Sequence, residues 1–178
     1  ALPGSGLGED VELEWQIDTS EDFGNPQSGS VTTSADSDHT VHVDPEGLEP
    51  ETEYFYRFVV KSGEFEGATS PVGRTLTAPE ADASVDNLNL AIASCANWES
   101  GFFAAYGDMA QRARAGEIDH VVFLGDYIYE YPTGEYAGKS GVARMHHPEW
   151  EITTLEDYRQ RHGRYRTDLN LQAAHAAC

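Results

Sequence analysis

The feature that most constrains the fold is an unbroken apolar run, Val121 to Leu124, which ends in Gly125 and Asp126. Such a run is typical of a strand buried on both faces of a parallel sheet, although periodicity alone also allows a buried helical segment. The glycine permits a tight bend. Because open α/β sheets bind ligands just past the carboxyl ends of their strands, Asp126 is a candidate site residue. The alternative is a strand that simply runs into a polar turn.

A second strand and a helix are predicted upstream of this run. Residues 88–95 alternate large apolar side chains before the residues become small, which predicts a strand that ends near Cys95. Residues 102–117 carry apolar side chains at the spacing of one helix face. These elements form one predicted β-α-β unit, residues 88–124, with parallel strands and a right-handed crossover. Both strand ends then open on one edge, where Cys95 and Asp126 would place a thiolate and a carboxylate suited to a metal.

Several segments carry a family resemblance. Ala93-Ser94-Cys95-Ala96-Asn97-Trp98 is followed by Leu124-Gly125-Asp126-Tyr127-Ile128-Tyr129-Glu130-Tyr131, and then by residues 154–159, 165–168 and 171–177. In order and spacing they resemble the PhoD-like alkaline phosphatases, which have the calcineurin-like metallophosphatase fold. The first eighty residues resemble the small β-sandwich of that family. The resemblance therefore covers nearly the whole chain.

The resemblance implies a metal-dependent phosphatase that hydrolyses phosphate monoesters, diesters or both with a metal-activated water or hydroxide. The implied cofactors are Fe(III) and Ca(II). Carried over residue by residue, Cys95 supplies a thiolate to iron, Asp126 bridges the metals and Tyr129 supplies a phenolate to iron. Thiolate and phenolate are anionic donors that suit a highly charged iron, whereas calcium takes oxygen ligands.

The chain departs from the common metallophosphatase pattern in two places. Ser94-Cys95-Ala96 stands where many of these enzymes have Asp-x-His, and tyrosines stand where a second acid usually follows Gly-Asp. Both departures point to the PhoD-like branch. The remaining ligands of the family are expected beyond Cys178, so we expect an N-terminal fragment with little or no catalytic activity. We also expect its second half to fold poorly, because a two-stranded sheet leaves apolar faces exposed.

The first half predicts an all-β module, so the expected fold class is all-β plus α/β. Short strands separated by turns suggest a sandwich; they are residues 11–17, 31–33, 40–43, 54–60 and 72–76. The stretch Leu48-x-Pro50-x-Thr52-x-Tyr54-x-Tyr56 resembles the corner of fibronectin type III-like modules, where a tyrosine ties a loop to a strand. We predict a fibronectin type III-like β-sandwich over 1–79, lacking its first strand, and a truncated metallophosphatase domain over 88–178.

A long irregular segment, residues 132–152, follows the second predicted strand. Loops of this length are usually functional or mobile. Its bases could guide an anionic group to the site or be incidental on a solvated loop; they are Lys139, Arg144, His146 and His147. Two helices should follow, one capped by Thr153 or Thr154 and one over residues 169–177. The arginines at 159, 161, 164 and 166 are expected to pair with the surplus acids rather than to bind phosphate.

The charge of the chain restricts its partners. The net charge is −20, from 31 acidic and 11 basic residues. Such a surface repels nucleic acid and anionic membranes, and no apolar stretch approaches the roughly 18 residues of a membrane span. It also repels phosphate esters unless bound cations offset the field locally. We expect a monomer that acts on small-molecule or polymeric phosphate esters and is secreted, periplasmic or at the cell surface.

Two other functions remain open at this stage. A non-enzymatic β-sandwich that binds a carbohydrate or a protein predicts an exposed aromatic patch within residues 10–76. A thiol hydrolase that uses Cys95 and a distant histidine predicts insensitivity to chelators.

A disulfide between Cys95 and Cys178 is disfavoured, because two distant cysteines give no framework pattern. Residues 1–9 are glycine-rich and expected to be loose.

Overall fold

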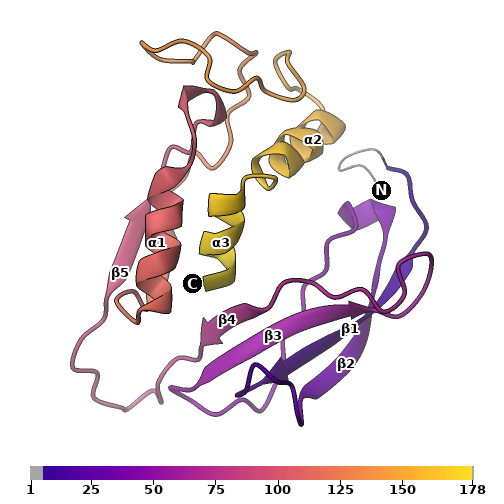
Figure 1. The fold of residues 1–178 in the computed structure, drawn as a ribbon, viewed down its shortest axis with the longest axis vertical. Coiled ribbons are helices and arrows are strands. Elements are labelled where there is room, and N and C mark those ends of the chain that lie inside the picture. The colour runs from indigo at the N-terminus through magenta and orange to yellow at the C-terminus, as the bar shows by residue number, and fades with distance from the viewer. Residues whose placement is uncertain (1–5, 178) are drawn as a thin grey trace. The chain divides into compact units, whose positions relative to one another are not determined.

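The computed structural model describes residues 6–177 of the chain. It contains two compact units, residues 8–88 and residues 89–176. Figure 1 shows strands and one short helical turn in the first unit, and both strands and longer helices in the second. Predictions for residues 1–5 and for Cys178 lie outside the described part, and the domain limits 1–79 and 88–178 stay a prediction.

The first unit is built on one antiparallel sheet of four strands in the order β2-β1-β3-β4. The strands are β1 (Val11–Asp18), β2 (Gln27–Thr33), β3 (Glu53–Val60) and β4 (Gly73–Leu76). In the register of β1 with β3, Trp15 faces Phe58 and Ile17 faces Tyr56. These pairs place large side chains on one face of the sheet, as the alternating pattern of residues 11–17 predicts.

Two strand predictions in this unit need correction. β2 begins at Gln27, four residues before the predicted start at residue 31. The strand predicted at 40–43 does not form, and that prediction is wrong. The reason lies just upstream: the 3-10 helix η1 (Ala35–Ser37) ends in Asp38 and His39, which both have positive φ and turn the chain away from an extended path. Because the described residues of this unit form a single sheet, the fibronectin type III-like sandwich stays a prediction.

The predicted tyrosine corner is confirmed. The hydroxyl of Tyr54, a buried residue of β3, accepts a hydrogen bond of 3.0 Å from the main-chain N–H of Glu49. Thr52 extends the same tie, because its main-chain N–H donates to Thr77 Oγ1 at 2.9 Å. The turn before β3 is therefore fixed to the sheet by side chains.

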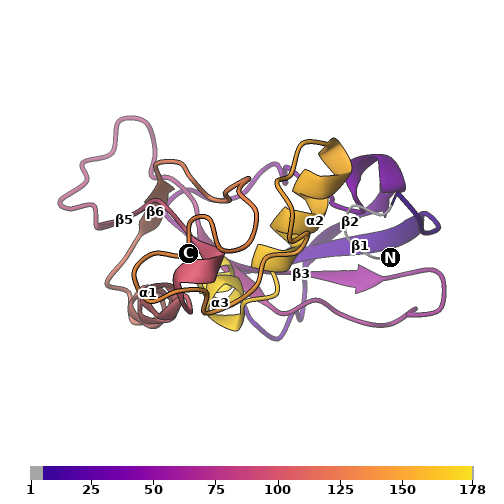
Figure 2. The same ribbon diagram turned by 90° about the horizontal axis from the view of Figure 1, so that it is seen from above.

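The second unit begins with the predicted β-α-β arrangement. Strands β5 (Leu90–Ala93) and β6 (His120–Phe123) are parallel, with Leu90 opposite His120 and Ala93 opposite Phe123. Between them lie the 3-10 helix η2 (Trp98–Ser100) and the helix α1 (Ala104–Arg114). Figure 2 shows the two strands side by side beyond α1. The ring of Tyr106 on α1 lies 6.5 Å from that of Phe123, so α1 covers one face of the pair.

The opposite face of this two-stranded sheet is open in the described part of the chain. Ile92 is 66% exposed, Val122 38% and Leu124 69%. The expectation that the run of residues 121–124 is buried on both faces is therefore wrong here. The physical reason is that side chains alternate between the faces of a strand, and α1 packs on only one of them.

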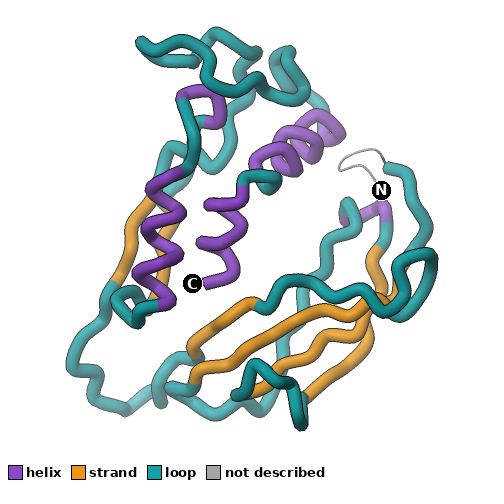
Figure 3. The backbone as a smooth tube through the Cα atoms, in the orientation of Figure 1, coloured by secondary structure: helices purple, strands orange, loops and turns teal. Residues whose placement is uncertain are grey.

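Two helices complete the second unit after a long connection. Residues 124–154 contain neither helix nor strand, and Figure 3 shows them as a continuous loop. The helices are α2 (Leu155–Tyr165) and α3 (Leu169–Ala177). Thr154 caps α2 as predicted, in a reciprocal capping box with Asp157. None of the described helices is both long and apolar enough to cross a membrane.

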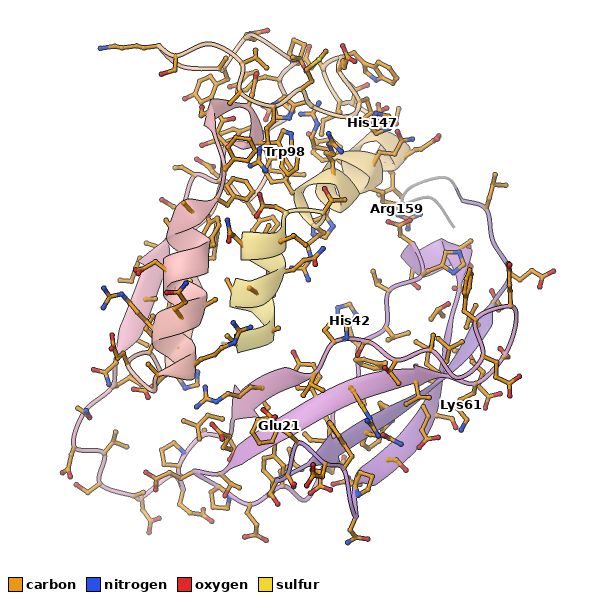
Figure 4. The ribbon with its side chains drawn as sticks, viewed as in Figure 1. Glu21, His42, Lys61, Trp98, His147 and Arg159 are labelled. Atoms are coloured by element: carbon orange, nitrogen blue, oxygen red, sulfur yellow. The ribbon has the colours of Figure 1, made fainter. Side chains whose placement is uncertain are left out.

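Aromatic rings form the centre of the second unit. Phe103 lies 6.0 Å from the Trp98 ring, 5.3 Å from Tyr106 and 5.9 Å from Tyr165, measured between centroids. Figure 4 shows the side chain of Trp98, the first residue of η2, on the side of that turn that faces α2. The main-chain N–H of Trp98 donates to the Tyr165 hydroxyl at 3.2 Å. This cluster joins α1, α2 and the segment after β5, and so positions the end of that strand.

Candidate metal centre

Cys95 and Asp126 lie just past the ends of the two parallel strands. Both have positive φ, 59° for Cys95 and 56° for Asp126. Two main-chain hydrogen bonds join the segments, from Cys95 N–H to Gly125 O at 3.2 Å and from Ala96 N–H to Asp126 O at 2.9 Å. A non-glycine residue in this left-handed region costs about 1–3 kcal/mol, and such residues occur in turns and cluster at active sites. The strand ends are thus bent and held together at the place where a ligand is expected.

The three residues predicted as metal ligands come together around one oxygen. Cys95 Sγ lies 3.4 Å from Asp126 Oδ2, and the Tyr129 hydroxyl donates to the same oxygen at 3.2 Å. Cys95 is an exposed free thiol. The predicted proximity of Cys95 and Asp126 is confirmed, and Tyr129 joins them from the loop after β6. Whether they bind a metal stays a prediction.

The electrostatics of this trio suit a cation. The pKa of Tyr129 is raised, first by its hydrogen bond with the Cys95 side chain, then by burial and by its hydrogen bond with Asp126. Each of these three groups becomes an anion when it loses its proton, so they disfavour one another's charged forms. A positive ion among them would reverse that effect. The donor set therefore fits a highly charged metal ion that accepts thiolate, carboxylate and phenolate ligands.

The trio does not make a complete coordination sphere. Over residues 6–177, no group of three or more His, Cys, Asp or Glu side chains is placed to hold a metal ion. Cys95 and Asp126 are two such residues, and Tyr129 adds a phenol. Calcium alone takes about six to eight oxygen ligands, so this edge offers part of a centre.

Stacked tyrosines extend outward from the trio. The Tyr129 ring lies 6.3 Å from that of Tyr131 and 5.3 Å from that of Tyr136, and the last two are 5.1 Å apart. Asn97 fixes this layer, because its side-chain amide donates to Tyr136 O at 2.8 Å. The segment after β5 and the loop after β6 are thus joined on this side too.

An open cavity of about 460 Å³ borders the thiol. Its walls come from the end of β5, η2 and the first turns of α1, and include Cys95, Asn97, Ser100, Phe102, Tyr106 and Met109. The lining combines apolar side chains with the thiol, an amide and hydroxyl groups, so the cavity leaves open space beside Cys95.

Two buried charged residues hold the loop and were not identified from the sequence. Glu99 and Arg161 are each 0% exposed. The Glu99 carboxylate accepts the main-chain N–H of Gly134, at 2.9 Å for the closer oxygen. The Arg161 guanidinium donates to four main-chain carbonyls of the loop. The expected pairing of the arginine stretch with surplus acids is therefore wrong for Arg161.

Two of the four bases of the loop, Arg144 and His146, are held inside the unit and do not line a path for anions. Arg144 donates to Asp168 at 2.5 Å and stacks over the Trp98 ring at 3.6 Å. His146 is 3% exposed, and burial followed by Arg161 lowers its pKa to about 4, against a smaller opposing effect of Glu99. Both predicted alternatives, a guiding role and a solvated loop, are wrong for these two residues. Both are parts of the interior.

His175, on α3, contacts the side chain of Tyr127. Its Nε2 lies 2.8 Å from the Tyr127 hydroxyl, which Arg166 also reaches at 3.5 Å. The Tyr127 ring packs 5.1 Å from Phe123. These contacts connect the residue after Asp126 to α3.

Comparisons with known proteins agree with this geometry. The model of the "PhoD-like phosphatase" family matches residues 90–178, and that of the "PhoD-like phosphatase, N-terminal domain" matches residues 2–79. Alkaline phosphatase D of Bacillus subtilis (strain 168) is 44% identical over 168 residues, which is 94% of this chain and 27% of that protein.

A solved structure described as the "Structure of PhoD" resembles the chain with a TM-score of 0.88 and 42% identity. The match covers 99% of this chain and 32% of the solved one. The chain thus spans about a third or less of the length of these relatives. Two family models that together cover nearly all of its residues show that the chain belongs to the PhoD-like phosphatase family.

Proposed function

We propose that this chain carries part of the active centre of a metal-dependent phosphatase that hydrolyses phosphate monoesters, diesters or both. The observation that supports this most strongly is the meeting of Cys95 Sγ, the Asp126 carboxylate and the Tyr129 hydroxyl within 3.4 Å at the ends of two parallel strands. Family membership supports the same reaction class.

In this proposal each residue has a distinct role. Cys95 and Tyr129 would hold a ferric ion through a thiolate and a phenolate, and Asp126, with two carboxylate oxygens, would hold that ion together with calcium. Bound cations would neutralise the phosphoryl oxygens and make a bound water acidic enough to act as the nucleophile. The residues themselves contribute fixed positions, because the bent strand ends are tied by the Cys95–Gly125 and Ala96–Asp126 main-chain hydrogen bonds.

Because the net charge of the chain is −20, bound metal ions would also be needed to attract an anionic substrate. An acidic surface slows the approach of a phosphate ester, because like charges repel over about 8–10 Å at physiological ionic strength. Two of the four bases of the described loop offer little compensation, since Arg144 is paired with Asp168 and His146 is buried. Cations at the strand ends would supply the local positive field that the substrate needs.

The alternatives have less support. The binding-module alternative predicts an exposed aromatic patch, but the strongly exposed large apolar residues between positions 10 and 76 of the described chain are Phe65 and Val72. The thiol-hydrolase alternative needs an imidazole beside Cys95, whereas the partner of its Sγ is the Asp126 carboxylate. We also propose the predicted fibronectin type III-like sandwich and metallophosphatase parts; the two family-model ranges support a boundary between residues 79 and 90.

The test uses the product of the whole gene, meaning this chain with any residues that the gene adds to it. We expect phosphatase activity that a chelator abolishes, and a visible phenolate-to-iron absorption band that Tyr129→Phe removes. Tyr131→Phe is the matched control, because Tyr131 stacks in the same layer and has no assigned ligand role. A metal-loaded protein with full activity and an unchanged band in Tyr129→Phe would contradict the assignment.

A further inference from the structure

We propose that Arg161 is the positioning residue of the candidate centre, because its guanidinium fixes the backbone that presents the Tyr129 phenol to Asp126. The inference rests on the proposed function only in taking Tyr129 as a ligand. α2 carries Arg161 into the interior, where its side chain has no exposed surface. The loop that it contacts is the one that supplies Tyr129.

The contacts of Arg161 reach both arms of the loop. Nη1 donates to Tyr129 O at 2.5 Å and to Tyr131 O at 3.1 Å. Nη2 donates to Pro148 O at 2.7 Å and to Trp150 O at 3.1 Å. One planar group with donors in fixed directions thus sets the distance between the outgoing and returning arms. A lysine ammonium is a single point with rotatable donors and cannot reproduce this pattern.

The arms have few other main-chain links. Ile152 N–H donates to Glu130 O at 2.9 Å, and Thr133 N–H donates to Glu149 O at 2.7 Å. Neither bond involves the main chain of Tyr129 itself, which is held on one side by a hydrogen bond with the Tyr165 side chain and at its carbonyl by Arg161. Because the phenol of Tyr129 donates to Asp126 at 3.2 Å, a shift of this backbone moves the hydroxyl away from the carboxylate.

The cost of burying Arg161 indicates that its role exceeds filling space. A buried guanidinium pays a large desolvation penalty, and its partners here are neutral carbonyls rather than an acid. Its Nε has no hydrogen-bond partner among the described residues. An apolar side chain of similar volume would fill the same space without that penalty. What the guanidinium adds, and an apolar side chain cannot, is four hydrogen bonds that join both arms of the loop beside Asp126.

The primary test places 3-fluorotyrosine at position 129 in the metal-free product of the whole gene and records its ¹⁹F NMR spectrum. We expect Arg161→Met and Arg161→Lys each to shift and broaden the Tyr129 resonance. Leu171→Ala, a buried truncation on α3, is the control for general loss of stability and should leave the resonance in place. An unchanged resonance in a folded Arg161 variant would overturn the proposal, as would an equal change in Leu171→Ala.

A measurement on the unmodified protein covers the case in which neither arginine variant folds. The Arg161 Nη protons should exchange with water far more slowly than those of the exposed Arg112. Exchange as fast as that of Arg112 would overturn the proposal.

Iron binding separates this proposal from the proposed function. With ferric citrate as the probe, Arg161→Lys should bind iron about 10–100-fold more weakly, the usual effect of losing a group that orients a ligand. If the unmodified protein shows neither iron binding nor phosphatase activity, the proposed function fails, while the fluorine spectrum still decides the role of Arg161. If it binds iron and Arg161→Lys binds it equally well, the positioning role fails and the proposed function stands.

Discussion

The two units differ in what their interiors contain. Between residues 8 and 88 the buried polar residue is Thr33, and the sheet is held by its ladder and by alternating apolar side chains. Between residues 89 and 176 the buried polar residues are Glu99, His146, Arg161 and Asp168. In the unit that carries the candidate centre, the burial of charged groups therefore lowers the stability of the fold. The same groups hold in place a long loop that has no helix or strand of its own.

The largest effect should come from breaking the buried ion pair of the second unit. Arg144→Met leaves Asp168 buried without its partner, so we expect a loss of about 3–5 kcal/mol in the stability of residues 89–176. Native-state hydrogen exchange, followed separately in peptides of the two units, measures it. Arg112→Met is the matched control, because that arginine pairs with acids on the surface and should cost less than about 1 kcal/mol. An equal loss of stability in Arg144→Met and Arg112→Met would show that the buried ion pair contributes no more than a surface pair, and would contradict the comparison of the two units.

A change of pH should separate the units through His146. Its folded pKa, about 4, is below the ordinary value of 6.5, so between these values the unfolded chain binds a proton that the folded chain does not. His146 alone should therefore lower the stability of the second unit by roughly 3 kcal/mol as the pH drops from 6.5 to 4, and His175, whose pKa is also lowered to about 4, adds to the slope. Denaturant unfolding across this range should show the slope, and His146→Phe should reduce it. A slope that His146→Phe leaves unchanged would contradict the assignment.

A smaller effect is expected in the first unit. Tyr54→Phe removes the hydroxyl that accepts the Glu49 N–H, and a buried hydrogen bond of this kind contributes about 1 kcal/mol. Amide exchange should accelerate for Glu49 and for β3, and should not change in residues 89–176. Faster exchange in the second unit as well would mean that the two units do not unfold independently.

The smallest effect should come from the open face of β5 and β6. Ile92→Thr should change the stability of the 178-residue chain by less than about 0.5 kcal/mol, because the side chain is exposed. Tyr106→Ala, on the face that α1 covers, should cost about 3–5 kcal/mol. The same pair of variants in the product of the whole gene shows whether this face becomes covered there, since Ile92→Thr would then become costly.

Features that depend on residue type and order could be predicted from the sequence, whereas features that depend on main-chain contacts could not. Periodicity locates the β-α-β unit, and parallel topology brings Cys95 and Asp126 to one edge, because both arguments depend on residue type and order. The roles of Glu99 and Arg161 could not be predicted in this way, because their hydrogen-bond partners are main-chain amides and carbonyls, which any residue provides. The strand expected at 40–43 failed for a similar reason, since the left-handed turn at Asp38 and His39 has no glycine to signal it.

The measurement that tests the account most directly is X-ray absorption at the iron edge of the iron-loaded product of the whole gene. We predict one sulfur scatterer in the first shell, lost in Cys95→Ser, together with oxygen scatterers that change in Asp126→Asn and in Tyr129→Phe. A first shell without sulfur, or one that none of these substitutions alters, would contradict the assignment of a metal centre at the ends of β5 and β6.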